Sequence, residues 1–434
     1  MTLVSKLKGA AIDAFLGSDK LRHAAAELRR KATGKGRVVD FYFDLADPWS
    51  YLAAQVAQRL TVAYPIDLRF HFVSPPASDV DPAPDMRRKH ALRDAIELAQ
   101  FWDVDFPGKK EVDPGPLRRG GQILIKPRAD QEQLAVALEV ATTLWNRDEK
   151  KLTSLMGKHG TEASGSLPPY LASSYSELRK AGHYQGAMFG YGGDWYWGLD
   201  RLAYLEARLR EDTGVEAPPV LSARPESDRA PEKLGGIASG RPVLEFWFSF
   251  RSPYAYLALG RTRELAQQFD LELNVRPIMP MVARGLAMPR DKRFYIVRDA
   301  NREANRLGIP FGNISDPLGK GVENALAIAK LAIERGKGLD FLESAARGAW
   351  SEARDLADYV DLRDVVERVG LAWDDAKAAL ADDSWRVWAQ DNAADLDGAG
   401  LWGVPSWRVG DYVTWGQDRL PMLADRLRRH FAAS

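Results

Sequence analysis

One segment of this chain occurs twice, and the second occurrence follows the first by 205 residues. The run Phe-Tyr-Phe-Asp-Leu-Ala-Asp-Pro-Trp-Ser-Tyr-Leu-Ala begins at Phe41, and it aligns without a gap on Phe-Trp-Phe-Ser-Phe-Arg-Ser-Pro-Tyr-Ala-Tyr-Leu-Ala from Phe246. Near the end of each half, Trp-Gly-Leu-Asp-Arg-Leu from Trp197 matches Trp-Gly-Gln-Asp-Arg-Leu from Trp415. An Arg-Asp pair recurs between these ends: Arg93 and Asp94, then Arg298 and Asp299. Matches in the same order predict two tandem copies of one domain.

A proline-rich stretch separates the two copies. Residues 213–240 contain several prolines and glycines without apolar periodicity, which is typical of a flexible or extended connector. We therefore assign residues 37–212 to a first domain and residues 241–434 to a second. Residues 1–36 precede the repeat as an amphipathic helical extension, for which two roles are open: capping the first domain, or self-association into a homo-oligomer.

Each half has the same predicted order of elements. A buried strand (residues 38–45 or 243–250) leads through a proline turn into a helix, and a second strand follows at 66–73 or 271–278. A long helical section comes next, and a strand, turn, strand and terminal helix close each half, as in residues 406–431. This order predicts an α/β fold of two tandem thioredoxin-like domains, each a mixed sheet with a helical insertion.

The composition excludes several classes of function. The chain has no cysteine, so disulfides and thiol–disulfide oxidoreductase chemistry are ruled out. Lysine plus arginine equals aspartate plus glutamate at 60 each, which provides no electrostatic reason to expect nucleic acid. No segment reaches the ~20 apolar residues of a membrane span, and no signal peptide is recognisable. We therefore expect a cytoplasmic protein with neither a nucleic-acid nor a membrane partner.

Histidine usage argues against two further kinds of site. Five of the six histidines lie in the first half, and the second half contains only His430, near its end. A histidine-based hydrolase site or metal site is therefore not expected in the second domain.

Three features of the second half are expected at one end of its sheet. Ser252 precedes Pro253 at the start of a helix, where unpaired amides and the helix dipole favour an anion. Val404 and Pro405 precede the hairpin, where a cis proline is common in this topology. Asp418 lies between the last strand and the last helix. Structural alternatives stay open, because Ser252 and Asp418 are also good helix caps.

These segments resemble the 2-hydroxychromene-2-carboxylate isomerase family, which is close to kappa-class glutathione transferases and to DsbA-type oxidoreductases. The resemblance is carried by Phe-x-Phe-Ser-Phe-x-Ser-Pro-Tyr-x-Tyr-Leu-Ala from Phe246, by Val-Pro before a strand, and by Trp-Gly-Gln-Asp-Arg-Leu from Trp415. It covers nearly all of residues 241–434 and, more weakly, residues 38–212.

The resemblance implies glutathione as cofactor and a role for each matching residue. The Ser252 hydroxyl would hydrogen-bond the glutathione sulfur and favour its thiolate. The Val404 backbone, before Pro405, would pair with the cysteinyl backbone. Gln417 and Asp418 would take the γ-glutamyl end, with Asp418 facing its ammonium group. The thiolate would add to a conjugated enone, permit rotation and leave again, which is a cis–trans isomerisation.

Substrate contacts are less defined by the residues. Tyr254 and Tyr295 are candidates for an aromatic substrate pocket, and core positions are the alternative. Lys292, with Arg290 and Arg293 beside it, is a candidate partner for a carboxylate, and a solvated helix start is the alternative. The family's Gly-Asn-x-Pro-Pro-like loop is replaced here by Pro-Met-Val-Ala-Arg-Gly at residues 280–285.

The first half departs further from the family pattern. Asp47 replaces the serine, and its charge would repel a thiolate. Met188 is aligned with Pro405, so the proline is missing. We interpret this half as a degenerate copy that keeps the fold and an interface role. A distinct site using Asp47 and Ser50 is the alternative.

Together these residues predict a glutathione-dependent isomerase or transferase that acts on a small aromatic or conjugated carbonyl compound, with its chemistry in the second domain. The alternative is a non-catalytic thioredoxin-like protein that binds a ligand or peptide through its proline edge.

Overall fold

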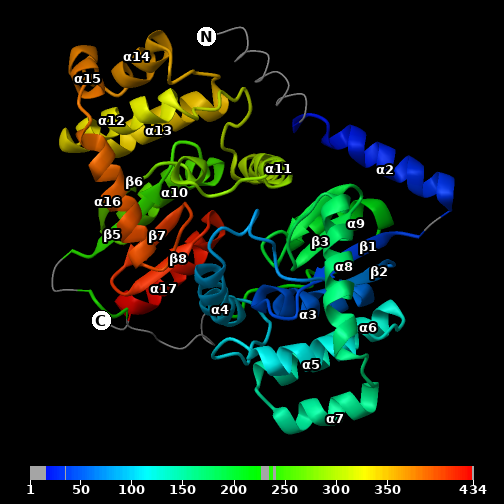
Figure 1. Ribbon diagram of the computed structural model, residues 1–434. Coiled ribbons are helices and arrows are strands. Elements are labelled where there is room, and N and C mark those ends of the chain that lie inside the picture. Colours follow the sequence, from blue (N-terminus) through cyan, green and yellow to red (C-terminus); the bar gives the residue numbers. More distant parts are fainter. Residues whose placement is uncertain (1–15, 35, 226–233, 238–240, 433–434) are drawn as a thin grey trace. The chain divides into compact units, whose positions relative to one another are not determined.

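The computed structural model describes residues 16–34, 36–225, 234–237 and 241–432 (Figure 1). The chain divides into two compact units. The N-terminal unit is Lys20–Ala230, and the C-terminal unit is Pro231–Ser434 together with Met1–Asp19. The division between residues 230 and 231 falls inside the stretch that the sequence predicts as a linker.

Each unit contains one four-stranded mixed sheet, with strand order β2-β1-β3-β4 in the first and β6-β5-β7-β8 in the second. In each sheet the first two strands of the chain are parallel, and the hairpin is antiparallel to the central strand. This confirms the predicted α/β, thioredoxin-like fold class. The strands are β1 (Val38–Phe43), β2 (Asp67–Phe72), β3 (Met188–Tyr191), β4 (Asp194–Trp197), β5 (Val243–Phe248), β6 (Glu272–Pro277), β7 (Ser406–Val409) and β8 (Tyr412–Trp415).

Helices surround both sheets, and most of them lie between the second and third strands of each unit. Those of the N-terminal unit are α2 (Asp19–Thr33), α3 (Pro48–Ala63), α4 (Pro84–Phe101), α5 (Pro114–Leu124), α6 (Asp130–Trp145), α7 (Glu149–His159), η1 (Ser164–Ser166), α8 (Leu167–Ala181) and α9 (Leu202–Thr213).

The C-terminal unit follows the same plan with a larger insertion. Its helices are α10 (Pro253–Gln268), η3 (Met281–Arg284), α11 (Arg290–Leu307), α12 (Lys320–Glu334), α13 (Gly338–Ser351), α14 (Tyr359–Glu367), α15 (Trp373–Leu380), α16 (Ser384–Gly398), η4 (Gln417–Arg419) and α17 (Leu420–Ala432). Figure 1 shows α12 to α15 grouped together, with α16 running back from them to the sheet.

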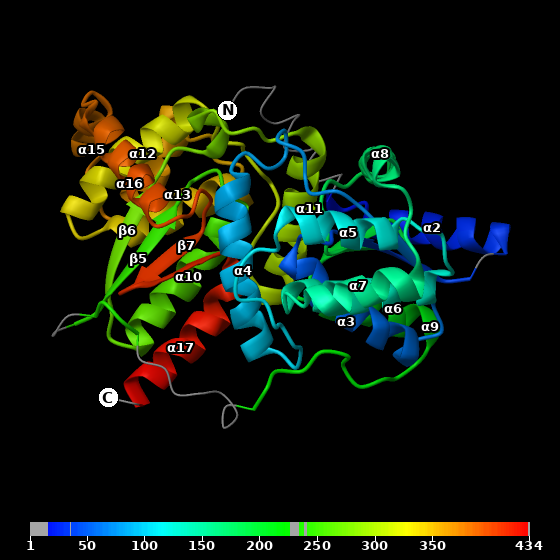
Figure 2. The same ribbon diagram turned by 60° about the horizontal axis from the view of Figure 1, so that its bottom comes forward.

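Side-chain alternation along β5 divides the C-terminal core into two layers. Phe246 and Phe248 lie in the main core, which also contains buried residues of α10 and α17. Trp247 points to the opposite face and packs against Leu396 of α16. Because successive side chains of a strand face opposite sides, one apolar strand supplies both layers. Helices therefore cover both faces of the sheet (Figure 2).

A cross-strand pair of aromatic side chains lies at equivalent central positions in both sheets. Phe246 pairs with Trp407 of β7, and their stacked rings lie 5.6 Å apart. In the other unit Phe41 pairs with Phe189 of β3, with the rings 4.7 Å apart. All four side chains are fully buried, so each pair links the central strand to the hairpin through packing as well as backbone bonds.

A second contact recurs at the same relative positions. The Trp49 indole donates to Asp94 at 2.7 Å, and the Tyr254 hydroxyl donates to Asp299 at 2.7 Å. Both bonds join the helix after the first strand to the Arg-Asp pair that the sequence comparison found in each half. The repeated residues therefore make equivalent contacts in the two units.

The strand pairing corrects one alignment made from sequence. Met188 and Ser406 each open the strand that pairs with the central strand, so Met188 corresponds to Ser406. Ala187 therefore corresponds to Pro405, and the carbonyl of each accepts a bond from the glycine after the hairpin, at 2.7 Å and 2.9 Å. Ala187 has a φ of 55°, in the left-handed region that favours glycine. The match of Trp197 with Trp415, an offset of 218 residues, places Ala187 opposite Pro405 as well, so the alignment from sequence was displaced by one residue.

The terminal and connecting segments pack on the units to which they belong. Arg22 of α2 forms an ion pair with Asp194 of β4 at 3.0 Å, whereas Leu16 is buried in the core of the C-terminal unit. The Arg224 guanidinium bonds to the carbonyl of Trp102 at 2.9 Å, so this part of the predicted linker lies against the N-terminal unit. The remaining linker residues 226–233 and 238–240, and residues 1–15 of the extension, lie outside the described residues.

Trp407→Ala should lower the free energy of unfolding by about 3–5 kcal/mol, because it leaves a cavity beside Phe246 in a fully buried core. Urea unfolding followed by far-ultraviolet circular dichroism measures this loss. Trp373→Ala, at a half-buried position, is the matched control and should cost clearly less. Equal losses of unfolding free energy in the two variants would contradict the prediction that the Trp407 side chain stabilises the core more than a half-buried tryptophan does.

Candidate functional site

The hydroxyl of Ser252 has two partners at the start of α10. It accepts a hydrogen bond from the backbone N–H of Ala255 at 3.2 Å, which makes Ser252 the N-cap of the helix. It also donates to the backbone carbonyl of Val404 at 3.2 Å. Capping alone does not need the second bond. Ser252 therefore both caps the helix and connects it to the loop before β7.

The Val404–Pro405 loop joins Ser252 to the end of the hairpin. The peptide bond between Val404 and Pro405 is cis, and the carbonyl of Pro405 accepts a bond from the N–H of Gly416 at 2.9 Å. Gly416 directly precedes Gln417 in the sequence. The structure thus brings four predicted residues, or the loops that carry them, to one edge of the sheet.

Gln417 is buried, and protein groups use its whole side-chain amide. Its nitrogen donates to Glu303 at 2.9 Å and to Asp418, and its oxygen accepts from Arg261 at 2.6 Å. Asp418 is only half-buried. Gln417 is therefore arranged to orient Asp418, whereas the prediction from sequence has both side chains contacting the ligand.

Charged groups of α10 and α11 surround this glutamine. Glu303 is buried and paired with Arg306 at 2.7 Å. Burial lowers the pKa of the Arg261 guanidinium from its ordinary value, while Asp418 and Glu303 act in the opposite direction. The γ-glutamyl end of the predicted site is thus a partly desolvated network in which acidic and basic side chains alternate.

The predicted substrate residues lie on the two helices beside this edge. The Tyr254 hydroxyl donates to Asp299, and its half-buried ring packs against the main core. Lys292 and Tyr295 lie in the first two turns of α11 and are half-buried. Neither is a hydrogen-bond partner of Ser252, whose side-chain bonds go to Ala255 and Val404.

Arg284 is a residue of this edge that sequence reasoning did not select. It ends η3, and its guanidinium donates to the carbonyl of Trp402 at 2.6 Å, two residues before Val404. The available signal was the arginine inside the loop that departs from the family pattern at residues 280–285. A single arginine in an irregular segment does not reveal from sequence that it folds onto a distant loop.

The corresponding edge of the N-terminal unit holds a buried acidic cluster. Asp47 takes the place of Ser252 and accepts bonds from the N–H and hydroxyl of Ser50 at 3.0 Å and 2.9 Å. Arg87 of α4 lies 3.8 Å from Asp47 and 2.9 Å from Asp81. Asp44 is buried beside them and accepts a bond from the N–H of Ala46.

Burial sets the ionisation of this cluster. It raises the pKa of Asp44 to about 7, with the charge of Asp47 adding to the effect. Burial also raises the pKa of Asp47, against the opposing influence of Arg87. Like charges this close and this desolvated resist joint ionisation. The exclusion of a thiolate from this edge, which the sequence analysis expects from Asp47, stays a prediction.

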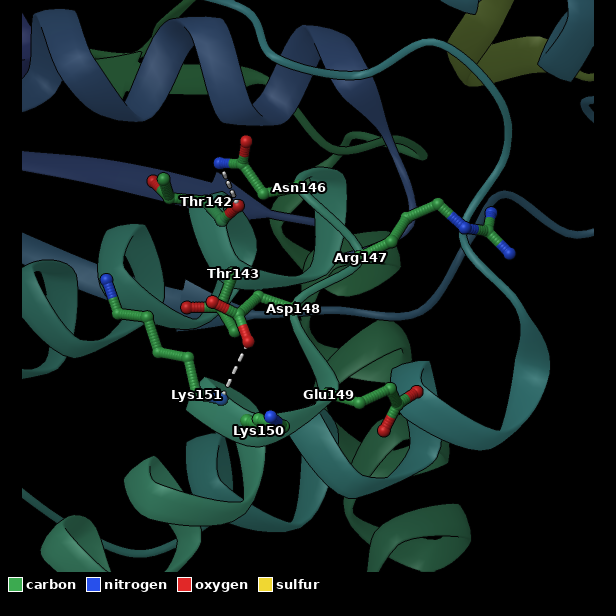
Figure 3. Close-up of a pocket in the computed structure, with 8 residues that line it drawn as sticks. All are labelled: Thr142, Thr143, Asn146, Arg147, Asp148, Glu149, Lys150 and Lys151. Carbon is green, nitrogen blue, oxygen red and sulfur yellow. Dashed lines mark hydrogen bonds between the residues drawn. The ribbon is translucent and has the colours of Figure 1, made fainter.

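A polar surface cavity of ≈ 540 Å³ lies elsewhere in the N-terminal unit, at the turn between α6 and α7 (Figure 3). Most of its lining residues are exposed, and Figure 3 shows Asp148 accepting from the N–H of Lys151 as the cap of α7. It contains none of the predicted site residues. We regard it as the open space around two helix ends.

The fold and the helix-terminus edge define the class of the C-terminal unit as a thioredoxin-like domain, and residues 243–428 match the DSBA-like thioredoxin domain. Two similar proteins are 2-hydroxychromene-2-carboxylate isomerases. The one from Sphingobium xenophagum is 25% identical over 193 residues, which cover 43% of this chain and 97% of that protein. The one from Pseudomonas putida is 27% identical over 203 residues, which cover 43% and 95%.

Solved structures with a similar fold include a 2-hydroxychromene-2-carboxylate isomerase at 24% identity, covering 44% of this chain and 98% of that chain, with a TM-score of 0.39. The cytosolic disulfide reductase DsbM from Pseudomonas aeruginosa with GSH matches at 18% identity over 44% and 96%, with a TM-score of 0.32. Within the described part of the chain, no helix has the length and apolar character needed to cross a bilayer. No group of three or more His, Asp or Glu residues in that part is arranged to hold a metal ion.

Asp44→Asn should stabilise the protein above neutral pH and have little effect below about pH 4. The folded state holds the Asp44 proton up to about pH 7, whereas the unfolded chain releases it near pH 4. The raised pKa therefore contributes a stability that falls as pH rises from about 4 to about 7. The amide keeps the acceptor for Ala46 but carries no charge.

Scanning calorimetry across this pH range measures the difference in Tm between variant and wild type, which should reach roughly 10 °C at pH 8. Asp85→Asn, which removes an exposed carboxylate of α4, is the control, and its difference in Tm from the wild type should not change with pH. If the difference in Tm for Asp44→Asn also does not change with pH, Asp44 is ionised in the folded protein.

Proposed function

We propose that the C-terminal unit is a glutathione-dependent isomerase that acts on a small aromatic or conjugated carbonyl compound. The observation that carries this proposal is the Ser252 hydroxyl, held between the first turn of α10 and the carbonyl of Val404. The isomerase relatives support the reaction class through the names they carry. Glutathione supplies the nucleophilic thiol that this cysteine-free chain lacks.

The residues present fit such a ligand. Ser252 and Val404 are both half-buried, so a bound group reaches them, while Pro253 and Pro405 beside them are buried. The first turn of α10 has backbone N–H groups without helical partners, and these favour a negative charge. A thiolate is the charge expected there, because the same physics lowers the pKa of thiols at helix N-termini.

Ser252 has one proton to give, and without a ligand it goes to the carbonyl of Val404. A ligand backbone N–H at the same carbonyl would compete with that donor for the oxygen. The hydroxyl would then be able to turn and donate to the sulfur, while it continues to accept from Ala255. Ligand binding and stabilisation of the thiolate are coupled through this one carbonyl oxygen.

Asp418 binds the ammonium group of the γ-glutamyl end, and Gln417 orients it. A carboxylate pairs well with an ammonium group when it is partly desolvated and held in one geometry. Gln417 supplies that geometry through its bonds to Glu303 and Arg261. This assigns Gln417 to positioning rather than to direct contact.

We further propose that the two units arose by tandem duplication and that the N-terminal one has lost this site. Equivalent pairs such as Phe41–Phe189 and Phe246–Trp407 support a common origin. At the site the N-terminal unit instead has Asp47 paired with Arg87. Its remaining role is that of a scaffold.

Ser252→Ala should raise the pKa of the thiol of bound glutathione by about one to two pH units, because a hydrogen bond to a charged group contributes about 1.5–3 kcal/mol. Thiolate absorbance in the ultraviolet, titrated at saturating glutathione, measures the shift.

Ser249→Ala is the matched control, since it removes a buried hydroxyl for which no partner is found among the described residues, and it should leave this pKa unchanged. Wild-type protein that binds no glutathione at millimolar concentration would reject the enzyme and favour a binding module for other ligands.

Asp418→Asn should weaken glutathione binding about 10- to 100-fold, because it removes the charge opposite the ammonium group. Isothermal titration with glutathione and with its des-amino analogue, glutaryl-cysteinylglycine, separates this contact from general damage. The variant should bind the analogue as well as the wild type does. If both ligands are weakened equally, Asp418 supports the fold of the loop and does not contact the amine.

A further inference from the structure

Arg284 is a half-buried cation beside the site loop. Its Nη2 group donates to the carbonyl of Trp402 at 2.6 Å. Its Nε group is buried, and among the residues that the structure describes it has no hydrogen-bond partner. A guanidinium carries five N–H donors in a planar fork, so most of its bonding capacity is not used by the protein.

The charge of Arg284 is also uncompensated. No ion pair joins it to a carboxylate within the described part of the chain, and Asp397 acts on it only at longer range. Other half-buried arginines of this unit are paired, such as Arg251 with Asp316 at 2.8 Å. Burial lowers the pKa of the Arg284 guanidinium, which reports the cost of desolvating a charge without a partner.

The topology puts this cation at the edge where Ser252 lies. β5 and β6 run parallel, so the segments that follow them, with Ser252 after β5 and Arg284 after β6, leave the sheet at the same end. The carbonyl that Arg284 holds belongs to Trp402, two residues before Val404. Ser252 and Arg284 therefore both donate hydrogen bonds to the short loop that contains Trp402 and Val404, and they do so from two different elements.

We propose that Arg284 binds a carboxylate of the ligand that occupies this site. The proposal rests on the proposed function. A half-buried guanidinium that has no ion pair among the described residues suits a planar anion, which it can contact through two parallel N–H bonds. Two carboxylates qualify: the glycyl carboxylate of glutathione, and a carboxylate on the aromatic substrate.

The two arginines beside Lys292 are less suited to this role. Arg293 is exposed, so water screens its charge. The guanidinium of Arg290 lies over the ring of Phe294, with its central carbon 5.1 Å from the ring centroid. Arg284 differs from both because it combines partial burial with an unused donor and a bond to the site loop.

Isothermal titration with glutathione and with its glycyl ethyl ester tests whether Arg284 binds the glycyl carboxylate of glutathione. If Arg284 binds the glycyl carboxylate, the wild type should bind the ester about 10- to 100-fold more weakly than glutathione, and Arg284→Met should bind both with the weaker affinity. Arg335→Met, which removes an exposed arginine at the end of α12, should bind both as the wild type does.

Titration with cinnamate and with cinnamamide, in the presence of S-methylglutathione, tests whether Arg284 binds a carboxylate on the aromatic substrate. If Arg284 binds the substrate carboxylate, Arg284→Met should lose affinity for cinnamate by a similar factor. Its affinity for the uncharged amide should be unchanged, and glutathione and its ester should bind the variant and the wild type alike.

The proposal is overturned if Arg284→Met changes neither the glutathione–ester difference nor the cinnamate–amide difference. Arg284 would then serve only to hold Trp402. That outcome is distinct from failure of the proposed function, in which the wild type itself binds no glutathione. Thermal unfolding of each variant verifies that the titrations are made on folded protein.

Discussion

The antiparallel pairing of β5 with β7 is the interaction on which the candidate site depends. Because the two strands run in opposite directions, the start of β7 lies beside the end of β5. Val404, just before β7, therefore meets Ser252, just after β5, although 152 residues separate them. The buried stack of Phe246 on Trp407 fixes that pairing from within the core. The large helical insertion lies between β6 and β7, so its last residues lead directly into the loop of Val404.

The two units place different side chains at the same edge of the fold. In the N-terminal unit the backbone of Gly186 approaches Ser50 so closely that a Cβ at Gly186 would lie 2.7 Å from the serine hydroxyl. Asp47 and Arg87 fill the edge that Ser252 occupies in the other unit. The N-terminal unit closes the edge with its own charges, whereas the C-terminal unit leaves a hydroxyl and a carbonyl half-exposed.

The element order was predictable because each strand and helix has a clear apolar period, and the recurring motifs identified Ser252 and Pro405. The alignment of Met188 with Pro405 was wrong by one residue, because the hydrogen-bond register and the 218-residue offset between Trp197 and Trp415 both place Ala187 at that position. The role of Gln417 was not accessible either. Its burial depends on Glu303, which belongs to a helix more than a hundred residues earlier in the chain.

The sequence by itself determined the two-fold repeat, the thioredoxin-like order of elements and the lack of any thiol, because these follow from local pattern and composition. Only the tertiary structure decided that Asp44 and Asp47 form a desolvated pair, that Gln417 is used internally, and that Arg284 reaches the loop of Val404. The reason is physical. Burial and charge compensation depend on distances between segments that lie far apart in the chain, and a periodic pattern carries no information about those distances.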